Sequence, residues 1–324
     1  MPLTALALVG VAALLHAAWN LWMKRAGVGG GMVFVWGTTV VSALGLAPLA
    51  WLAGAFSRGG STAQPTGAPE GALRAAADAT GAAVGQGASI ADWPASVWIA
   101  VAISVVVHTA YFRVLQRGYG AGDLSIVYPV ARGTGPLLAS LVAIVWLGES
   151  AGPGSLAGLA LVVFGTLTVA GGGALLRAGA SPTARRGLAW GVGIGVLIAG
   201  YTVNDGRAVS LLGAHPLVFY WAICVLQAVV LAPWVMRGLP GWRRLLVGSW
   251  PVVLGVGLLS PLSYVLVLEA MRQAPISVVA PARELSMLIA ALVGATVLGE
   301  GQLGRRLAGS ALIATGVALL ATAG

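Results

Sequence analysis

Apolar residues occur along the chain in long runs, the pattern expected of membrane-spanning helices. A helix needs about 20 mostly apolar residues to cross the hydrocarbon core of a bilayer. Runs of that length without Asp, Glu, Lys or Arg are 1–23, 26–57, 93–112, 150–176, 208–236 and 245–268. Three further runs contain a charge or are shorter: 124–148, 187–204 and 273–299. With 307–324 at the end of the chain, the pattern predicts ten transmembrane helices.

A different composition interrupts the pattern at residues 55–92. This stretch is rich in Gly, Ala, Ser and Pro and offers little that a folded structure can bury. Sequences of this kind do not repay the entropy lost when a chain becomes ordered. We therefore expect a flexible loop outside the membrane.

The two halves of the chain repeat each other. The Leu-Gly-Glu step that ends at Glu149 recurs 151 residues later at Glu300, and each glutamate follows an arginine by 17 positions, namely Arg132 and Arg283. Nearer the start of each half the offset rises to 153 and then to 184, which is explained if the first half holds about 31 extra residues in its loop. Repeats at a fixed offset indicate two copies of one unit.

The number of helices in each unit predicts how the units are arranged. Five is an odd number, so the second unit must cross the membrane in the opposite sense to the first. The sequence therefore predicts an all-α integral membrane fold of ten transmembrane helices in two inverted five-helix repeats, residues 1–178 and 185–324.

Composition agrees with a lipid environment and excludes several classes of function. Hydrophobic residues make up 58% of the 324 and charged residues only 8%, against roughly a quarter in soluble domains. The net charge of +9 comes from short basic clusters between apolar runs, so nucleic-acid binding is not expected. The three histidines share no metal-ligand spacing, and the single cysteine, Cys224, excludes an internal disulfide. We expect no metal, no cofactor and, without a phosphate-binding glycine motif, no ATP drive.

The basic residues also predict how the chain is oriented. Placing both termini outside puts 12 of the 18 Lys and Arg residues on the cytoplasmic side and four outside, with Arg132 and Arg283 inside the membrane. Cytoplasmic loops of membrane proteins carry an excess of Lys and Arg. We therefore expect both termini on the outer side.

Three stretches of the chain resemble the EamA-type members of the drug/metabolite transporter superfamily. They are HAAWNLWMKRA at 16–26, YPVARGTGPLLASLVAIVWLGE at 128–149 and APARELSMLIAALVGATVLGE at 280–300. The resemblance implies a ten-helix transporter with a cavity lined by spans one, three, four, six, eight and nine, and with the last span of each half at the periphery. It does not specify a substrate, because the family moves amino acids, nucleosides, sugars and drugs. Many members are drawn with both termini in the cytoplasm, which differs from the orientation expected here.

Charged residues inside predicted spans are the first candidates for function. Arg132 and Arg283 lie seven to nine residues into their spans, roughly 11–14 Å along the helix axis. A charge at that depth costs at least about 2.5 kcal/mol on insertion scales, so it is expected to face a cavity or a partner. The arginines either bind cargo or a coupling ion, or are structural, bonded to Glu284 or to carbonyls freed by Pro129 and Pro281. Glu284 is either a proton-coupling carboxylate or the counter-ion of Arg132.

Polar side chains on matching faces of the first and sixth spans form a second group. Spacings of three and four residues place each set on one helical face. The two sets are His16, Trp19 and Asn20, and Tyr201, Asn204 and Asp205. Such faces either line a cavity or join neighbouring helices through hydrogen bonds. Further candidates are His108, Tyr111, Tyr128 and Tyr264.

Some glutamates and glycines are expected to be structural. Glu149 and Glu300 follow glycines where spans end, and an acid suits the N-terminus of the next helix. Gly187, Gly191 and Gly195 recur every four residues, which allows a neighbouring helix to approach closely.

These patterns predict a secondary transporter of the inner (plasma) membrane that moves a small polar metabolite, such as an amino or organic acid, outward by alternating access. Two buried arginines with one nearby acid favour a cargo that carries a carboxylate or similar anionic group. The rival interpretations are an importer of the same fold, an intramembrane enzyme acting on a lipid-linked substrate, and a non-transporting receptor or scaffold. Proton coupling is an open alternative, and both a monomer and a homodimer are compatible with the sequence.

Overall fold

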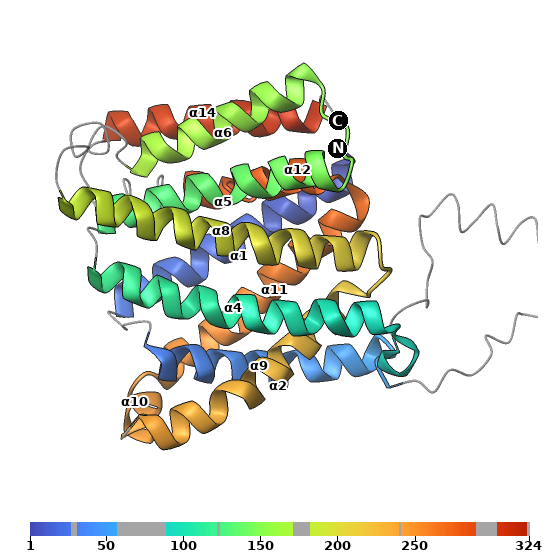
Figure 1. The fold of residues 1–324 in the computed structure, drawn as a ribbon, viewed down its shortest axis with the longest axis vertical. Helices are drawn as coiled ribbons and strands as arrows, with labels where there is room; N and C mark the ends of the chain where they lie inside the picture. Colours follow the sequence, from blue (N-terminus) through green and yellow to red (C-terminus); the bar gives the residue numbers. More distant parts are fainter. Residues whose placement is uncertain are drawn as a thin grey trace, which may run out of the picture.

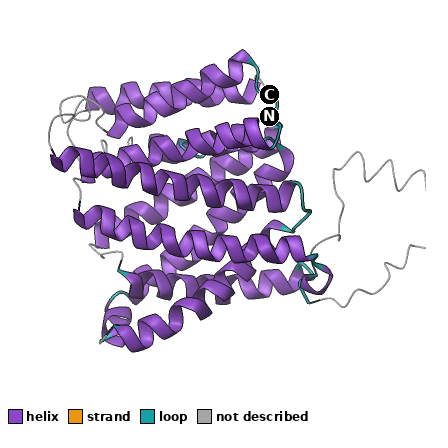
Figure 2. Cartoon of the chain, viewed as in Figure 1, coloured by secondary structure: helices purple, strands orange, loops and turns teal. Residues whose placement is uncertain are grey.

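The computed structural model describes residues 1–26, 31–56, 89–121, 124–170, 182–239, 241–289 and 303–322. The regular structure in these ranges is helical (Figure 1, Figure 2). The elements are α1 (Leu3–Ala26), α2 (Met32–Leu52), the 3-10 helix η1 (Ile90–Asp92), α4 (Ala95–Ala121), α5 (Leu124–Trp146), α6 (Pro153–Ala170), α8 (Pro182–Ser210), α9 (Pro216–Gly238), α10 (Trp242–Gly248), α11 (Trp250–Gln273), α12 (Ile276–Ala282) and α14 (Leu303–Thr322). Most of the predicted 55–92 loop and Glu300 lie outside the described residues.

The long helices coincide with the apolar runs of the sequence. In lipid, a helix satisfies the backbone N–H and C=O groups of a single segment without help from water. Seven helices in the described ranges are long and apolar enough to cross a membrane: Leu3–Met23, Met32–Leu52, Ala95–Gly118, Ile126–Trp146, Arg185–Ser210, Pro216–Gly238 and Trp250–Gln273. The predicted all-helical fold with many spans is confirmed, and the number ten stays a prediction.

The remaining predicted spans are shorter or interrupted. The apolar part of α6 runs only from Pro153 to Val169. The predicted ninth span breaks after α12, where Arg283 and Glu284 form a turn before the helix resumes at residues 285–289. The turn keeps helical backbone angles at Arg283 and is closed by hydrogen bonds such as Glu284 N to the Pro281 carbonyl at 3.0 Å. It is therefore a local tightening of the helix, and Arg283 lies within it.

Helices that are distant in sequence pack side by side (Figure 1). α6 packs on α14, α8 on both α5 and α4, α1 on α11, and α2 on α9. The predicted packing role of the α8 glycines is confirmed, because α5 lies directly against them. A Cβ added to Gly187 would lie 3.2 Å from the Ile126 side chain, and one added to Gly191 would lie 2.6 Å from that of Val130.

The contact between α6 and α14 is made by two pairs of glycines. A Cβ on Gly158 would lie 2.8 Å from the carbonyl oxygen of Gly316, and a Cβ on Gly316 would lie 2.7 Å from that of Gly158. Gly165 and Gly309 meet in the same way, at 2.7 and 2.8 Å. The two helices therefore run antiparallel, with a backbone separation that only glycine permits.

The bundle has two chemically different ends (Figure 1). At one, here called the terminal end, the two chain termini meet and the Met1 amino group donates a hydrogen bond to the Ala321 carbonyl at 2.7 Å. The other is here called the basic end and is formed where α4 and α9 finish and α8 and α14 begin. Basic residues predicted to be cytoplasmic gather there: Arg117, Arg185, Arg186, Arg237, Arg243, Arg244, Arg305 and Arg306.

Candidate functional site

A cavity of about 1110 Å³ lies in the centre of the bundle. Its wall includes Met32, Gln116, Leu239 and Leu245, which lie near the basic end of their helices. Within the described ranges, no connection at the terminal end contributes to the wall. The cavity therefore extends to the basic end, and its described wall stops short of the terminal end. Besides the helices that the family resemblance named, α2 and α9 also line it.

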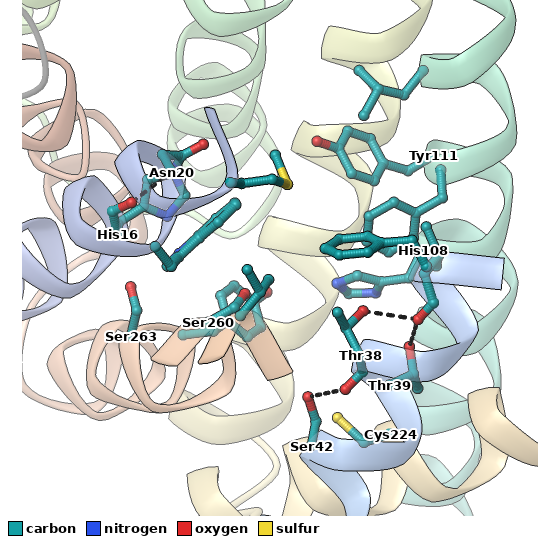
Figure 3. A pocket seen from close by; sticks show the side chains of 18 of the residues that line it. His16, Asn20, Thr38, Thr39, Ser42, His108, Tyr111, Cys224, Ser260 and Ser263 are labelled. Atoms are coloured by element: carbon teal, nitrogen blue, oxygen red, sulfur yellow. Dashed lines mark hydrogen bonds between the residues drawn. The ribbon is translucent and has the colours of Figure 1, made fainter. Parts of the chain in front are cut away.

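Most of the predicted site residues line this cavity. They are His16, Trp19, Asn20, His108, Tyr111, Tyr128, Arg132, Tyr201, Tyr264 and Arg283. Figure 3 shows His16 and Asn20 of α1 across the cavity from His108 and Tyr111 of α4. Asn204, Asp205 and Glu284 are not part of the wall. The structure thus brings together predicted site residues from six predicted spans and places Asn204, Asp205 and Glu284 behind them.

Glu284 lies behind the wall as the partner of Arg132. Its Oε2 is 3.1 Å from Arg132 Nη2, and the two side chains are 4% and 18% exposed. The same guanidinium nitrogen donates a hydrogen bond to Ser286 Oγ at 3.2 Å. Separating a buried ion pair leaves an uncompensated charge, so the contact favours the charged form of both members. Of the two hypotheses for Glu284, this geometry favours the counter-ion of Arg132.

Arg283 has a different environment. Its Nη1 donates to Thr202 Oγ1 at 3.4 Å, and its guanidinium carbon lies 5.3 Å from the centre of the Tyr264 ring. The described part of the chain provides no carboxylate within ion-pair distance of it. An aromatic face and a hydroxyl stabilise a cation only partly. Arg283 therefore presents to the cavity a positive charge that a bound anion can neutralise.

Two hydrogen-bond donors at the cavity lack acceptors. Trp19 Nε1 and Arg132 Nε are buried and have no partner among the described residues. Trp19 also packs edge to face on the His16 ring, with centroids 4.8 Å apart. The Asn20 amide, in contrast, donates to the His16 carbonyl at 2.7 Å. Buried donors in proteins are nearly always paired, so these two N–H groups are unsatisfied in this state, but both nitrogens are covered by their neighbours and do not face the open cavity.

Asp205 forms a polar cluster that joins three helices. It is fully buried and accepts hydrogen bonds from Ser104 Oγ of α4, from Asn204 Nδ2 at 3.2 Å and from Tyr264 OH of α11 at 2.8 Å. For Asn204 and Asp205, the geometry thus agrees with the hypothesis of hydrogen bonds between helices. Tyr201, from the same predicted set, instead lines the cavity.

Aromatic rings separate this cluster from the cavity. The His108 ring stacks on Tyr201 with centroids 4.3 Å apart, and both rings meet Tyr264, each at 6.1 Å. His108 Nδ1 lies 2.9 Å from the Ser104 carbonyl, which can only accept, so Nδ1 donates and Nε2 is the free acceptor. Within the described ranges, no three His, Cys, Asp or Glu side chains are placed to hold a metal ion.

Polar lining residues on α2, α9 and α11 were not predicted from the sequence. Thr38, Thr39, Ser42, Ser260 and Ser263 are among them, with Cys224 beside them (Figure 3). Tyr220 and Gln227 of α9 also line the cavity. A signal was present, because residues 220, 224 and 227 recur at helical spacing on one face of an apolar run. Hydroxyls within spans are also explained by bonds to the helix backbone, as in Thr39, which donates to the Val35 carbonyl at 2.8 Å.

Glu149 is structural, as expected, but caps a different helix from the one predicted. Its Oε1 accepts from Ile276 N at 2.7 Å and its Oε2 from Ser277 N at 2.8 Å. These groups begin α12 in the second half of the chain, whereas the prediction named the next helix, α6. Ser140 Oγ of α5 adds a bond to the Ser277 carbonyl at 3.0 Å. Together the contacts hold α5 and α12 together at the terminal end.

The fold and the cavity define a multi-pass, all-helical membrane protein. The sequence model of the EamA-like transporter family matches residues 185–322, so this half of the chain is an EamA-like transporter domain, and the resemblance to the drug/metabolite transporter superfamily is confirmed. No curated protein matches the chain. A solved crystal structure, described only as that of a protein, superposes with a TM-score of 0.70 at 19% identity, over 99% of this chain and 97% of that one. It shows that the fold is shared.

Proposed function

We propose that this protein is a secondary transporter of the inner membrane that carries a small anionic metabolite through the central cavity by alternating access. The observation that carries the proposal is Arg283, a cation on the cavity wall whose partners in the described part of the chain are all neutral. The side chains of Trp19 and Arg132 line the same cavity, and each has an unpaired N–H group that a small rearrangement would present to a bound molecule. A carboxylate supplies both the negative charge and the acceptor oxygens that these groups lack.

The contact between α6 and α14 supports the inverted-repeat part of the proposal. The offset of 151 relates Gly158 to Gly309 and Gly165 to Gly316. Replacing each residue of the Gly158–Gly316 contact by its counterpart in the other half gives the Gly309–Gly165 contact. Both contacts are observed. Self-complementary contacts of this kind are expected where a two-fold axis passes between equivalent elements. The α1–α11 pair corresponds in the same way to the α8–α4 pair.

Alternating access requires the cavity to open at each end in turn. Here it is reached from the basic end, which the excess of arginines assigns to the cytoplasm. The structure then represents an inward-open state, with Glu149 and α12 closing the outer end. Opening that end requires the two Glu149 hydrogen bonds to break.

The test is transport by purified protein in proteoliposomes, using labelled amino acids and organic acids alongside their neutral amides. We expect at least one acid to be transported and its amide to be rejected. Arg283→Ala removes one partner of a charge pair, which costs roughly 2–5 kcal/mol, or about 30-fold or more in affinity. Arg283→Lys keeps the charge but loses the two-pronged contact, so its effect is smaller.

A matched control separates loss of the site from loss of a positive charge. Arg113 is an exposed arginine of α4 whose guanidinium lies over the Trp234 ring at 4.5 Å, outside the cavity. Arg113→Ala is expected to transport normally. Normal transport by Arg283→Ala, or a cargo that is neutral, would contradict the anionic-cargo proposal. Arg132→Ala is less informative because it leaves Glu284 without its partner.

A further inference from the structure

Asp205 and Glu284 are two buried carboxyl groups in different electrostatic environments. Glu284 is held by the Arg132 guanidinium at 3.1 Å. Asp205 has hydrogen bonds only from the neutral groups of Ser104, Asn204 and Tyr264, and within the described residues no Lys or Arg lies within ion-pair distance of it. Burial favours the neutral carboxylic acid, whereas three donors favour the carboxylate. Asp205 can therefore gain or lose a proton without breaking an ion pair.

The titratable and charged groups around Asp205 come from every side of the cluster. α4 supplies the His108 imidazole, which interacts electrostatically with the carboxylate. α11 supplies the Tyr264 hydroxyl, and α9 supplies that of Tyr220, whose ring lies 4.8 Å from the Tyr264 ring. The turn after α12 supplies Arg283, which lies against Tyr264.

His108 lies between the cavity and the Asp205 cluster. His108 lines the cavity, and its Nε2 is free to accept a proton because Nδ1 donates to the Ser104 carbonyl. The side chain of the same serine donates to Asp205. His108 and Asp205 therefore both contact Ser104, one through its carbonyl and the other through its hydroxyl, with His108 on the cavity side.

Tyr264 connects the carboxyl to the anion site. Its hydroxyl donates to Asp205 Oδ2 at 2.8 Å, and its ring lies 5.3 Å from the Arg283 guanidinium carbon. When Asp205 is ionised, its negative charge adds to that of Glu284 in offsetting Arg283, and when Asp205 is protonated only Glu284 remains to do so. Charges roughly 10 Å apart in a protein interact strongly enough to change an anion's affinity on the order of tenfold.

We propose that Asp205 is the proton-binding carboxyl of the transport cycle, and that its protonation strengthens anion binding at Arg283 so that proton and anion cross together. The assignment of the anion site rests on the proposed function. Linkage requires the effect to be reciprocal, so a bound anion also strengthens proton binding. Where protons flow inward, such coupling drives uptake, in contrast to the outward movement expected from the sequence.

Proton binding can be measured without any cargo, by infrared difference spectroscopy of the purified full-length protein between mildly alkaline and mildly acidic pH. We expect a carboxylic-acid carbonyl band to appear on acidification, to vanish in Asp205→Asn and to persist in Glu284→Gln. If Asp205→Asn does not fold, Asp205→Glu should retain the band at a shifted frequency. The proposal is overturned if Asp205→Asn leaves the band intact or if Asp205→Glu leaves its frequency unshifted. It is also overturned if no carboxylic-acid band appears on acidification.

Two further variants test the connection through Tyr264. Tyr264→Phe removes a donor to the carboxylate, and Arg283→Gln removes a nearby positive charge, so both should move the midpoint of the band to higher pH. Arg272→Gln, which alters an exposed cation paired with Glu269, should leave the midpoint unchanged. An unmoved midpoint in Arg283→Gln refutes the coupling. These results do not depend on transport, so failure of the anionic-cargo proposal would be seen separately, as normal transport by Arg283→Ala.

Discussion

The contact between Glu149 and the start of α12 gives a direct test of how the terminal end opens. In Glu149→Gln the side chain keeps one acceptor oxygen, so at most one of the Ile276 and Ser277 N–H groups keeps its partner. Hydrogen bonds to a charged group contribute about 1.5–3 kcal/mol, and an acid at a helix N-terminus about 0.3–1 kcal/mol. Because the amide retains part of this energy, we expect the closed end to lose about 1–2 kcal/mol, which raises the open fraction about 5–30-fold.

The assay is the rate at which a membrane-impermeant thiol reagent, added on the side of the termini, reaches the cavity. Ser260 lines the cavity, so Ser260→Cys in a Cys224→Ser background provides a single thiol there. Its labelling rate should rise on the order of tenfold in Glu149→Gln. Glu269→Gln is the matched control, because Glu269 pairs with Arg272 near the same end and both side chains are 33% exposed.

Two outcomes would refute this reasoning. An unchanged rate in Glu149→Gln would show that the carboxylate does not hold the terminal end closed. An equal increase in the labelling rate in Glu269→Gln would mean that the change results from a general loss of negative charge at that end.

Two other predictions concern packing and topology. Gly165→Ala places a Cβ 2.7 Å from the Gly309 carbonyl oxygen, so we expect a loss of about 1–3 kcal/mol, seen as a lower Tm in detergent. Gly193→Ala in α8, with nothing within 4 Å, should not lower the Tm, and equal Tm values for the two variants would contradict the α6–α14 contact. Alkaline phosphatase, which needs disulfides formed outside the cytoplasm, should be active when fused after Gly324 and inactive after Arg243, and the reverse pattern would invert the orientation while leaving the fold intact.

The sequence predicts the helices and the depth of the charges well, because both follow from lipid as the solvent. A run without charges, such as 245–268, has to be helical to satisfy its backbone, and α11 covers residues 250–273. The same argument predicts that a charge within a span faces a cavity or a partner. Arg283 faces the cavity, and Arg132 has both the cavity and Glu284.

The contacts between helices could not be predicted in the same way. Asp205 and Tyr264 are 59 positions apart, and Glu149 and Ile276 are 127 positions apart. The repeat offset tells which residues correspond in the two halves, but it does not tell which ones touch. The break after α12 was also missed, because 273–299 has the length and composition of a continuous span and Pro281 lies within the helical part.

The two intramembrane arginines correspond in the repeat, but the intramembrane acids have no acidic counterparts. The two arginines therefore have different electrostatic partners. Arg132 corresponds to Arg283 at the offset of 151, but the counterpart of Glu284 at that offset is Gly133. The counterpart of Asp205 at the offset of 184 is Leu21. Each acid therefore exists in the second half alone, and one of them is already committed to Arg132.

On the proposed inverted-repeat scaffold, asymmetric charges give different tasks to equivalent positions. Substitution of Arg132 disturbs an ion pair between α5 and the turn after α12, so its first effect is on stability. Substitution of Arg283 removes a cation that has only neutral partners among the described residues, so its first effect is on anion affinity. If the halves exchange conformations during the cycle, the charge distribution does not exchange with them. Under the proposed alternating access, a symmetric movement of the helices would therefore be sufficient to present the proposed cargo site, with Arg283 on its wall and Asp205 behind it, to each side of the membrane in turn.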